Sequence, residues 1–203
     1  NAFRAILVHR TDMHTVGQFL AASALSHVYV NFVLQAMGLD YLPRLTRYKD
    51  NKTECNRLVN EQTEIALLLA VPGVTALVVL APLLIPIFYS GRFTDAIEVF
   101  RWQCLGVLLK VASWALSFVL IALGLRTQFL FAETITNAVY VGAFYFLVQQ
   151  YALTGAALAF AVVYLWYLAL TFFIVRRATG FEWSANARRI LLARVLFIHD
   201  EGQ

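Results

Sequence analysis

A lysine lies in the middle of an apolar segment that is long enough to cross a membrane. The segment runs from Ile97 to Ala122, and Lys110 stands about 12 residues, or ~18 Å of helix, from either end. An unpaired lysine at the centre of a bilayer costs roughly 2.5 to 3.5 kcal/mol, and snorkelling to the surface would need a longer side chain. We predict that Lys110 faces a polar interior, with the opposite side of its helix toward lipid, and that it attracts an anion.

Polar side chains recur along one face of each of three predicted spans. Spacings of three, four and seven residues bring side chains onto the same helical face. Three such faces predict a bundle that encloses a hydrated cavity, as in a transporter. For His27 alone, a hydrogen bond between packed helices is an equal alternative to a proton-carrying role. The candidate cavity and substrate-binding residues are Lys110, Glu133, Asn137, Gln103, Asn31 and His27.

Glu133 is the second charged residue on these faces. Counted from the turn at Gly124 and Leu125, Lys110 lies about 14 residues back and Glu133 about 8 forward, so their Cα atoms differ in depth by ~9 Å. A direct salt bridge and two separate sites on adjacent helices both remain open. Glu133 would either hold Lys110 in place or take up a proton during a transport cycle.

The composition is that of an integral membrane protein. The 203 residues are 61% hydrophobic and 14% charged, with a mean hydropathy of +0.69, which excludes an ordinary soluble domain. The net charge of +4 is therefore interpreted as a sign of membrane orientation, and no nucleic-acid partner is expected. Cys55 and Cys104 fall at opposite ends of the predicted topology, so we expect neither a disulfide nor a metal site. No catalytic residue or cofactor is predicted.

The hydropathy pattern predicts about five transmembrane helices. Pro72, Pro82 and Pro86 predict a kinked or broken second span. The chain begins with Asn1 and half an apolar element, so we expect a fragment of a longer protein. The predicted segments are a remnant of a preceding helix with a periplasmic loop (1–15), a transmembrane lobe (16–177) with spans at about 16–38, 64–89, 97–122, 129–150 and 154–175, a cytoplasmic loop (40–63), and a tail (178–203).

Basic residues set the expected orientation. Eleven lysines and arginines fall on the side of the 40–63 loop and the tail, and four fall on the other side. The positive-inside rule therefore places that loop and the tail in the cytoplasm. The tail mixes arginines with Ile190, Leu192 and Leu196, which predicts an amphipathic helix on the membrane surface, with the start of a further span as the alternative.

The Lys110 helix and its flanks resemble a known transporter family. The likeness spans Val16 to Arg177 and is strongest from Phe100 to Val111 and at Glu133. These segments resemble the C-terminal half of the Wzx-type flippases of O-antigen and lipid III (enterobacterial common antigen), in the multidrug/oligosaccharidyl-lipid/polysaccharide (MOP) superfamily. The residues that carry the strongest likeness are Phe100, Trp102, Gln103, Gly106, Leu109, Lys110, Val111, Leu120, Ile121, Ala122 and Glu133.

The resemblance implies an all-α membrane protein, the C-terminal six-helix lobe of a MATE-like two-lobe transporter. It implies a central cationic cavity that flips an undecaprenyl-diphosphate-linked oligosaccharide across the bacterial inner (cytoplasmic) membrane, in the biosynthesis of O-antigen, lipopolysaccharide or a related surface polysaccharide. The N-terminal lobe is missing, so this chain alone is not expected to transport. The identity of the glycan, the energy source and the oligomeric state are left open.

Three other functions fit parts of the sequence. A drug or cation antiporter of the same superfamily is the first alternative, although a cavity lysine would repel a cationic drug. A non-transporting membrane subunit leaves Lys110 and Glu133 unexplained. A membrane enzyme acting on polyprenyl phosphates would need clustered acidic ligands, whereas Asp40, Asp50 and Glu54 are scattered. We therefore predict a transporter and not an enzyme.

Overall fold

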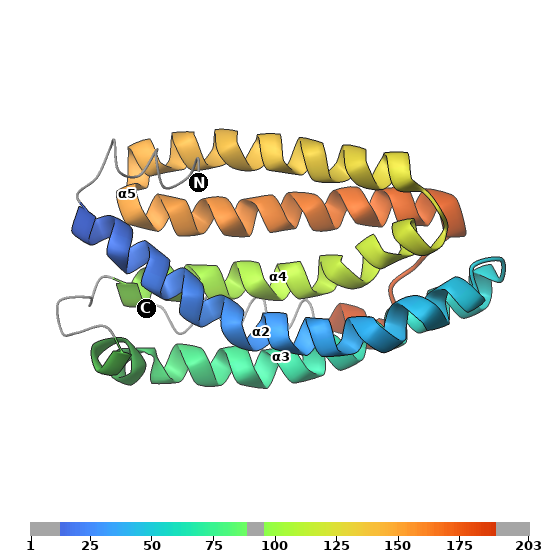
Figure 1. Cartoon of the computed structure of the whole chain (residues 1–203), viewed down its shortest axis with the longest axis horizontal. Coiled ribbons are helices and arrows are strands. Elements are labelled where there is room, and N and C mark those ends of the chain that lie inside the picture. Colours follow the sequence, from blue (N-terminus) through green and yellow to red (C-terminus); the bar gives the residue numbers. More distant parts are fainter. Residues whose placement is uncertain (1–12, 89–95, 190–203) are drawn as a thin grey trace.

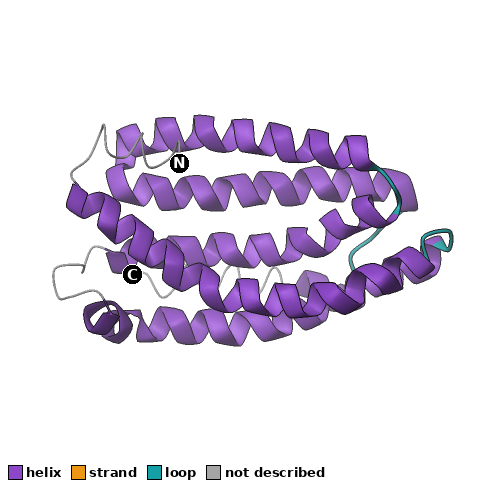
Figure 2. Ribbon diagram, viewed as in Figure 1, coloured by secondary structure: helices purple, strands orange, loops and turns teal. Residues whose placement is uncertain are grey.

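The structure is a computed structural model that describes residues 13–88 and 96–189. All regular structure within these ranges is helical (Figure 2). The four helices, labelled as in Figure 1, are α2 (Met13–Arg47), α3 (Lys52–Phe88), α4 (Ala96–Ala122) and α5 (Arg126–Thr179). The remnant predicted over residues 1–15 lies outside the described residues, except that Met13 to Thr15 already belong to α2.

α5 is folded back on itself near its middle. Ala152 has non-helical backbone angles (φ 47°, ψ −122°), and the two arms, 126–151 and 153–179, run side by side (Figure 1). Gly155 permits this close return, because a Cβ atom there would lie 2.0 Å from the carbonyl oxygen of Leu147. The break falls between the two segments predicted as separate spans, and it brings both ends of α5 to the same end of the molecule.

α4 is the central helix, and it packs against α2, α3 and α5. Most of its apolar window is buried inside the protein. Val107, Val111 and Ala115 are fully enclosed, so the prediction that one side of this helix faces lipid is wrong. Small residues allow neighbours to approach from several directions, as at Gly106, where an added Cβ would lie 2.3 Å from the ring of Phe160.

Helices occupy most of the segment 40–63, for which the sequence predicts a solvent-exposed loop with some helix. α2 continues through Pro43 to Arg47, and α3 begins at Lys52 after a short turn. Apolar side chains at helical spacing continue past the predicted span, and Tyr41 and Leu45 are buried. Tyr41 donates a hydrogen bond from its hydroxyl to the carbonyl oxygen of Ala115 (3.0 Å), which ties α2 to α4.

α3 contains all three prolines of the predicted second span and is nevertheless continuous from Lys52 to Phe88. Its last turns appear nearly end-on in Figure 1, at an angle to the rest of the helix. Pro72 and Pro82 are exposed at the surface of the bundle. The prolines therefore bend this helix without interrupting it, as is common where a neighbouring helix supports the chain.

Three described helices are long and apolar enough to cross a membrane: Lys52–Leu83, Val99–Ala122 and Arg126–Thr179. The last contains the two arms of α5. The all-helical membrane fold predicted from the sequence is thereby confirmed, and the number of five spans stays a prediction.

Most of the described basic residues lie at one end of the bundle. The end of α2, the start of α3, the α4–α5 turn and both ends of α5 lie there, on the right of Figure 1. We call this the basic end, and its described basic residues are Arg44, Arg47, Lys49, Lys52, Arg57, Arg126, Arg176 and Arg177.

The chain after α5 is bound to α3 at this end. Gly180, in the left-handed conformation, caps α5, and Phe181 is buried. Asn56 accepts a hydrogen bond from the hydroxyl of Thr179 (2.9 Å), and Asn60 accepts one from the amide of Ser184 (2.8 Å). Residues 185–189 are helical again. The beginning of the predicted tail therefore packs on the bundle, while the rest of the predicted amphipathic helix lies outside the described residues.

Candidate functional site

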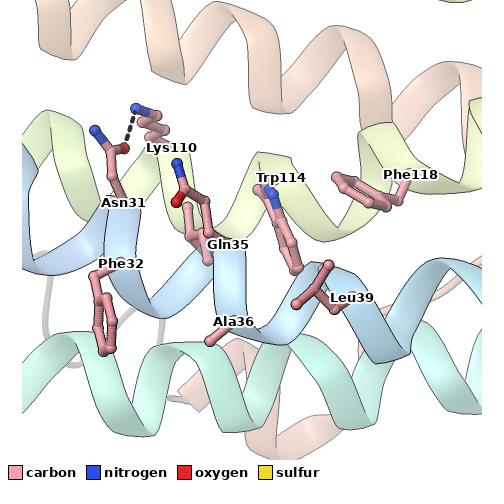
Figure 3. Close-up of a pocket in the computed structure, with 10 residues that line it drawn as sticks. Asn31, Phe32, Gln35, Ala36, Leu39, Lys110, Trp114 and Phe118 are labelled. Carbon is pink, nitrogen blue, oxygen red and sulfur yellow. Dashed lines mark hydrogen bonds between the residues drawn. The ribbon is translucent and has the colours of Figure 1, made fainter.

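Lys110 points from α4 toward α2 and meets a neutral partner. Its Nζ donates a hydrogen bond to Oδ1 of Asn31 (3.0 Å), as Figure 3 shows. The same Nζ lies 6.0 Å from the centre of the Tyr164 ring, a distance compatible with a cation–π contact. Among the described residues, no carboxylate forms an ion pair with Lys110. The lysine is therefore held in place without being neutralised.

An open pocket of ≈ 670 Å³ lies beside this contact, between α2 and α4. Asn31, Gln35 and Lys110 supply its polar groups at one end (Figure 3). Trp114 and Phe118, whose ring centres are 4.6 Å apart, form an aromatic wall farther along α4. The pocket thus combines one uncompensated cation with largely apolar walls, which reduce the screening of that charge by water.

Glu133 has a different environment on the first arm of α5. Its Oε1 accepts a hydrogen bond from the hydroxyl of Tyr167 (2.5 Å) on the second arm. Its backbone oxygen accepts a bond from Nδ2 of Asn137 (2.8 Å), one helical turn along. Asn137 is exposed and has no bond to another helix among its described contacts. The two residues therefore form one local group within α5.

Two tyrosines connect the surroundings of Lys110 and Glu133. Tyr164 lies under the Lys110 amine and Tyr167 bonds Glu133, and their ring centres are 6.5 Å apart in an edge-to-face arrangement. No ion pair joins Lys110 to Glu133, both of which lie in the described part of the chain. The sequence left open a direct salt bridge between Lys110 and Glu133 or two separate sites. The structure has the two residues at separate sites.

Gln103 and Asn137 are not among the described residues that line this pocket. Gln103 is buried, and its Nε2 donates to Oγ of Ser23 (2.7 Å), so it ties α4 to α2. His27 belongs to α2, one turn before Asn31, and its side chain lies outside the described residues. Of the six predicted residues, the structure brings together Lys110 with Asn31 and Glu133 with Asn137.

Sequence reasoning missed the tyrosines of the last helical arm. Tyr164, Tyr167 and Thr171 are spaced by three and four residues, the same signal that identified the other polar faces. Tyrosine is counted among the hydrophobic residues of the composition, so this face was not recognised as polar. Within the described ranges no group of three or more His, Cys, Asp or Glu residues could hold a metal ion, and both cysteines are free thiols.

The comparisons with known proteins agree with this architecture. Residues 3–98 match a family model described as "Polysaccharide biosynthesis protein". The lipid III flippases of Escherichia coli (strain K12) and Shigella flexneri are each 24% identical over 167 residues, which cover 82% of this chain and 40% of each relative. The chain thus spans about two fifths of the length of these curated relatives.

A solved structure shares the fold. The chain is similar to the lipid II flippase MurJ in an inward closed conformation, with a TM-score of 0.71 and 16% identity, over 93% of this chain and 41% of that one. The matched sequences and the shared fold confirm the resemblance of this chain to part of a lipid-linked flippase of the MOP superfamily.

Proposed function

We propose that the protein containing this chain flips an undecaprenyl-diphosphate-linked oligosaccharide across the bacterial inner membrane. Two curated relatives support the substrate class by their names, since each is called a lipid III flippase. We assign the protein to the synthesis of O-antigen or a related surface polysaccharide of the lipopolysaccharide layer, in the manner of the Wzx flippases.

The observation that carries this proposal is the environment of Lys110. The amine is fixed by Asn31 at the edge of an open pocket, and no carboxylate of the described residues neutralises it. A positive charge in a weakly screened cavity acts strongly on an anion. The substrate's diphosphate, or an acidic sugar, would supply the missing counter-charge. A cationic drug would be repelled, which disfavours an antiporter of such drugs.

We assign Glu133 a separate role in the same cycle. Its carboxylate is bound by the neutral hydroxyl of Tyr167 and not by Lys110. Glu133 would then hold the two arms of α5 together through Tyr167, while Lys110 attracts the substrate. His27 and Asn137 stay candidates for the cavity wall and not for direct contact with the diphosphate, whereas the bond of Gln103 to Ser23 ties α4 to α2.

The basic end is proposed to face the cytoplasm, with the tail on the same side. The lysines and arginines gathered there follow the positive-inside rule for a multi-pass protein of the inner membrane. A cysteine introduced at Lys49 should react with membrane-impermeant reagents only in inside-out vesicles. Labelling from the periplasm instead would reverse the orientation. The N-terminal lobe that the resemblance implies is the proposed partner of this lobe in transport.

The decisive experiment measures surface glycan in cells that depend on the longer protein containing this segment. Lys110→Ala should lose export at normal expression, and Lys110→Arg should keep part of it, because arginine retains the charge with a different shape. Gln103→Ala is the matched control, since Gln103 is also a polar residue of α4 but bonds Ser23 away from the pocket. Full export by Lys110→Ala, at equal protein level, would contradict the proposal.

A further inference from the structure

A second pocket lies at the basic end and shares no lining residue with the Lys110 pocket. Its volume is ≈ 920 Å³. The α4–α5 turn and the start of α5 form one side of it, through Leu123, Thr127 and Phe131, and the end of α5 forms the other side. Figure 1 shows these two ends of α5 next to each other, at the right of the view. The pocket is therefore built by the return of α5 on itself.

Arg177 brings an uncompensated positive charge to this pocket. The neighbouring arginine differs, because Arg176 pairs with Glu182 (3.8 Å) and lies 5.9 Å from the centre of the Phe172 ring. Arg177 has no acidic partner among the described residues, and none of the described lining residues is acidic. Two adjacent arginines at one helix end thus have different surroundings, one satisfied within the protein and one open to a ligand.

The opposite wall adds hydrogen-bond donors to this charge. Thr127 and Gln128 belong to the first turn of α5, and Leu125 at its N-cap supplies no side-chain hydrogen bond. The first backbone N–H groups of a helix lack partners within it and carry the positive end of the helix dipole. With the guanidinium of Arg177 across the pocket, these groups give a place where a phosphate would meet donors on two sides.

The rest of the lining is apolar and faces outward. Phe131 is 60% exposed, and Leu170 and Ile174 continue the apolar surface along the second arm. The pocket is thus polar and cationic where α5 begins and ends, and apolar farther into the predicted membrane span. A phospholipid has the complementary order, with an anionic headgroup at the membrane surface and acyl chains below it.

We propose that this pocket binds an anionic phospholipid, with its phosphate between Arg177 and the first turn of α5 and an acyl chain against Phe131, Leu170 and Ile174. The site is independent of the proposed flipping activity, because it needs only the geometry of the two α5 ends. The bound lipid would stabilise the contact between the α5 arms at the leaflet on the basic side.

Native mass spectrometry of the purified protein in detergent tests this site. Dioleoylphosphatidylglycerol and dioleoylphosphatidylcholine are added in separate titrations, and the bound lipid is counted. We expect a clear preference for the phosphatidylglycerol in the wild type. Arg177→Gln should weaken its binding by about tenfold, the size of one lost charge-assisted contact, and Arg177→Lys should keep part of it. Arg176→Gln, which removes the same charge one residue earlier, should bind like the wild type.

Two results would overturn the proposal. Equal weakening by Arg176→Gln and Arg177→Gln would show a general effect of charge at the helix end, without a specific site. Displacement of the phosphatidylglycerol by an excess of inorganic phosphate would show a simple anion site, since a lipid held also by its acyl chain should resist that competitor. Resistance to phosphate together with a loss specific to Arg177→Gln supports lipid binding.

Discussion

Two arginines of the basic end, Arg44 and Arg57, and the two charges in the middle of the bundle have opposite kinds of partner. At the basic end Arg44 contacts Asp40 and Glu61, and Arg57 contacts Glu54 and Glu61, all at 3.0–3.7 Å. In the middle, the described partners of Lys110 and Glu133 are neutral, Asn31 for the one and Tyr167 for the other. The two arginines form ion pairs that are exposed to water. Lys110 and Glu133, which have opposite charges, do not pair with each other.

This difference indicates which charges serve the fold and which serve a ligand. Exposed ion pairs cost little to maintain and contribute little. A charge inside a membrane bundle is costly unless it is paired, and Lys110 and Glu133 would pair with each other if stability alone were served. Tyr164 and Tyr167 occupy the space between them instead. A transporter that binds an anion at Lys110 would need this lysine to be unpaired, and the separation of Lys110 from Glu133 meets that need.

Exchanging the two central charges is expected to have the largest effect. The double variant Lys110→Glu with Glu133→Lys keeps the net charge but places a carboxylate at the Asn31 pocket. We expect it to lose export as fully as Lys110→Ala, because an anionic substrate would be repelled. Surface glycan measured at equal protein level provides the test. Recovery of export by the exchange would mean that the two residues act as a structural pair and that Lys110 does not bind the substrate.

Sequence reasoning identified the central charges and the face of Asn31 because polar residues at helical spacing stand out in an apolar chain. It assigned Gln103 to the cavity as well, although the structure buries it against Ser23. The spacing of residues along one helix shows which of them share a face of that helix. Which neighbour covers that face depends on the packing angle and on the size of the facing side chains, and α4 is enclosed by three helices.

The helical membrane fold was also predictable, but the ends of the helices were not. Hydropathy locates the part of a helix that would lie in lipid. It does not detect helical turns that continue beyond the membrane. α2 extends past Pro43 because Tyr41 and Leu45 have buried positions in the basic end. The return of α5 at Ala152 depends on Gly155 and its close approach to Leu147, a tertiary contact that no local pattern reports.

Removing the Tyr167 hydroxyl tests how much the neutral partner of Glu133 contributes to stability. Tyr167→Phe leaves the ring in place and deprives the carboxylate of its described donor. A buried acceptor without a partner costs about 1–3 kcal/mol, so we expect a lower melting temperature in detergent. Tyr164→Phe is the matched control, because its ring rather than its hydroxyl faces Lys110. Equal destabilisation by both variants would show that the Tyr167 to Glu133 bond has no special weight.

Cysteine accessibility tests whether the Lys110 pocket is open to water. Asn31 and Gln35 line the pocket, whereas Val30 and Leu34 are buried on the same helix. Single cysteines at the first two positions should react with water-soluble thiol reagents at least ~10-fold faster than cysteines at the last two, because adjacent positions point about 100° apart. A cysteine at Phe32 cannot serve as an unreactive control, because Phe32 also lines the pocket and is 74% exposed. Similar rates at all four positions would argue against a hydrated pocket.

The smallest effect is expected where charges are already paired. Arg44 lies 3.3 Å from Asp40 and 3.7 Å from Glu61, and all three side chains are substantially exposed. Water and salt screen such contacts, so Arg44→Ala should change the free energy of unfolding by no more than about 1 kcal/mol and should leave glycan export unchanged. High salt should reduce even that difference, as measured by thermal unfolding in detergent. A loss of export as deep as that of Lys110→Ala would mean that paired and unpaired charges serve the protein alike, and the function assigned to the isolated lysine would lose its support.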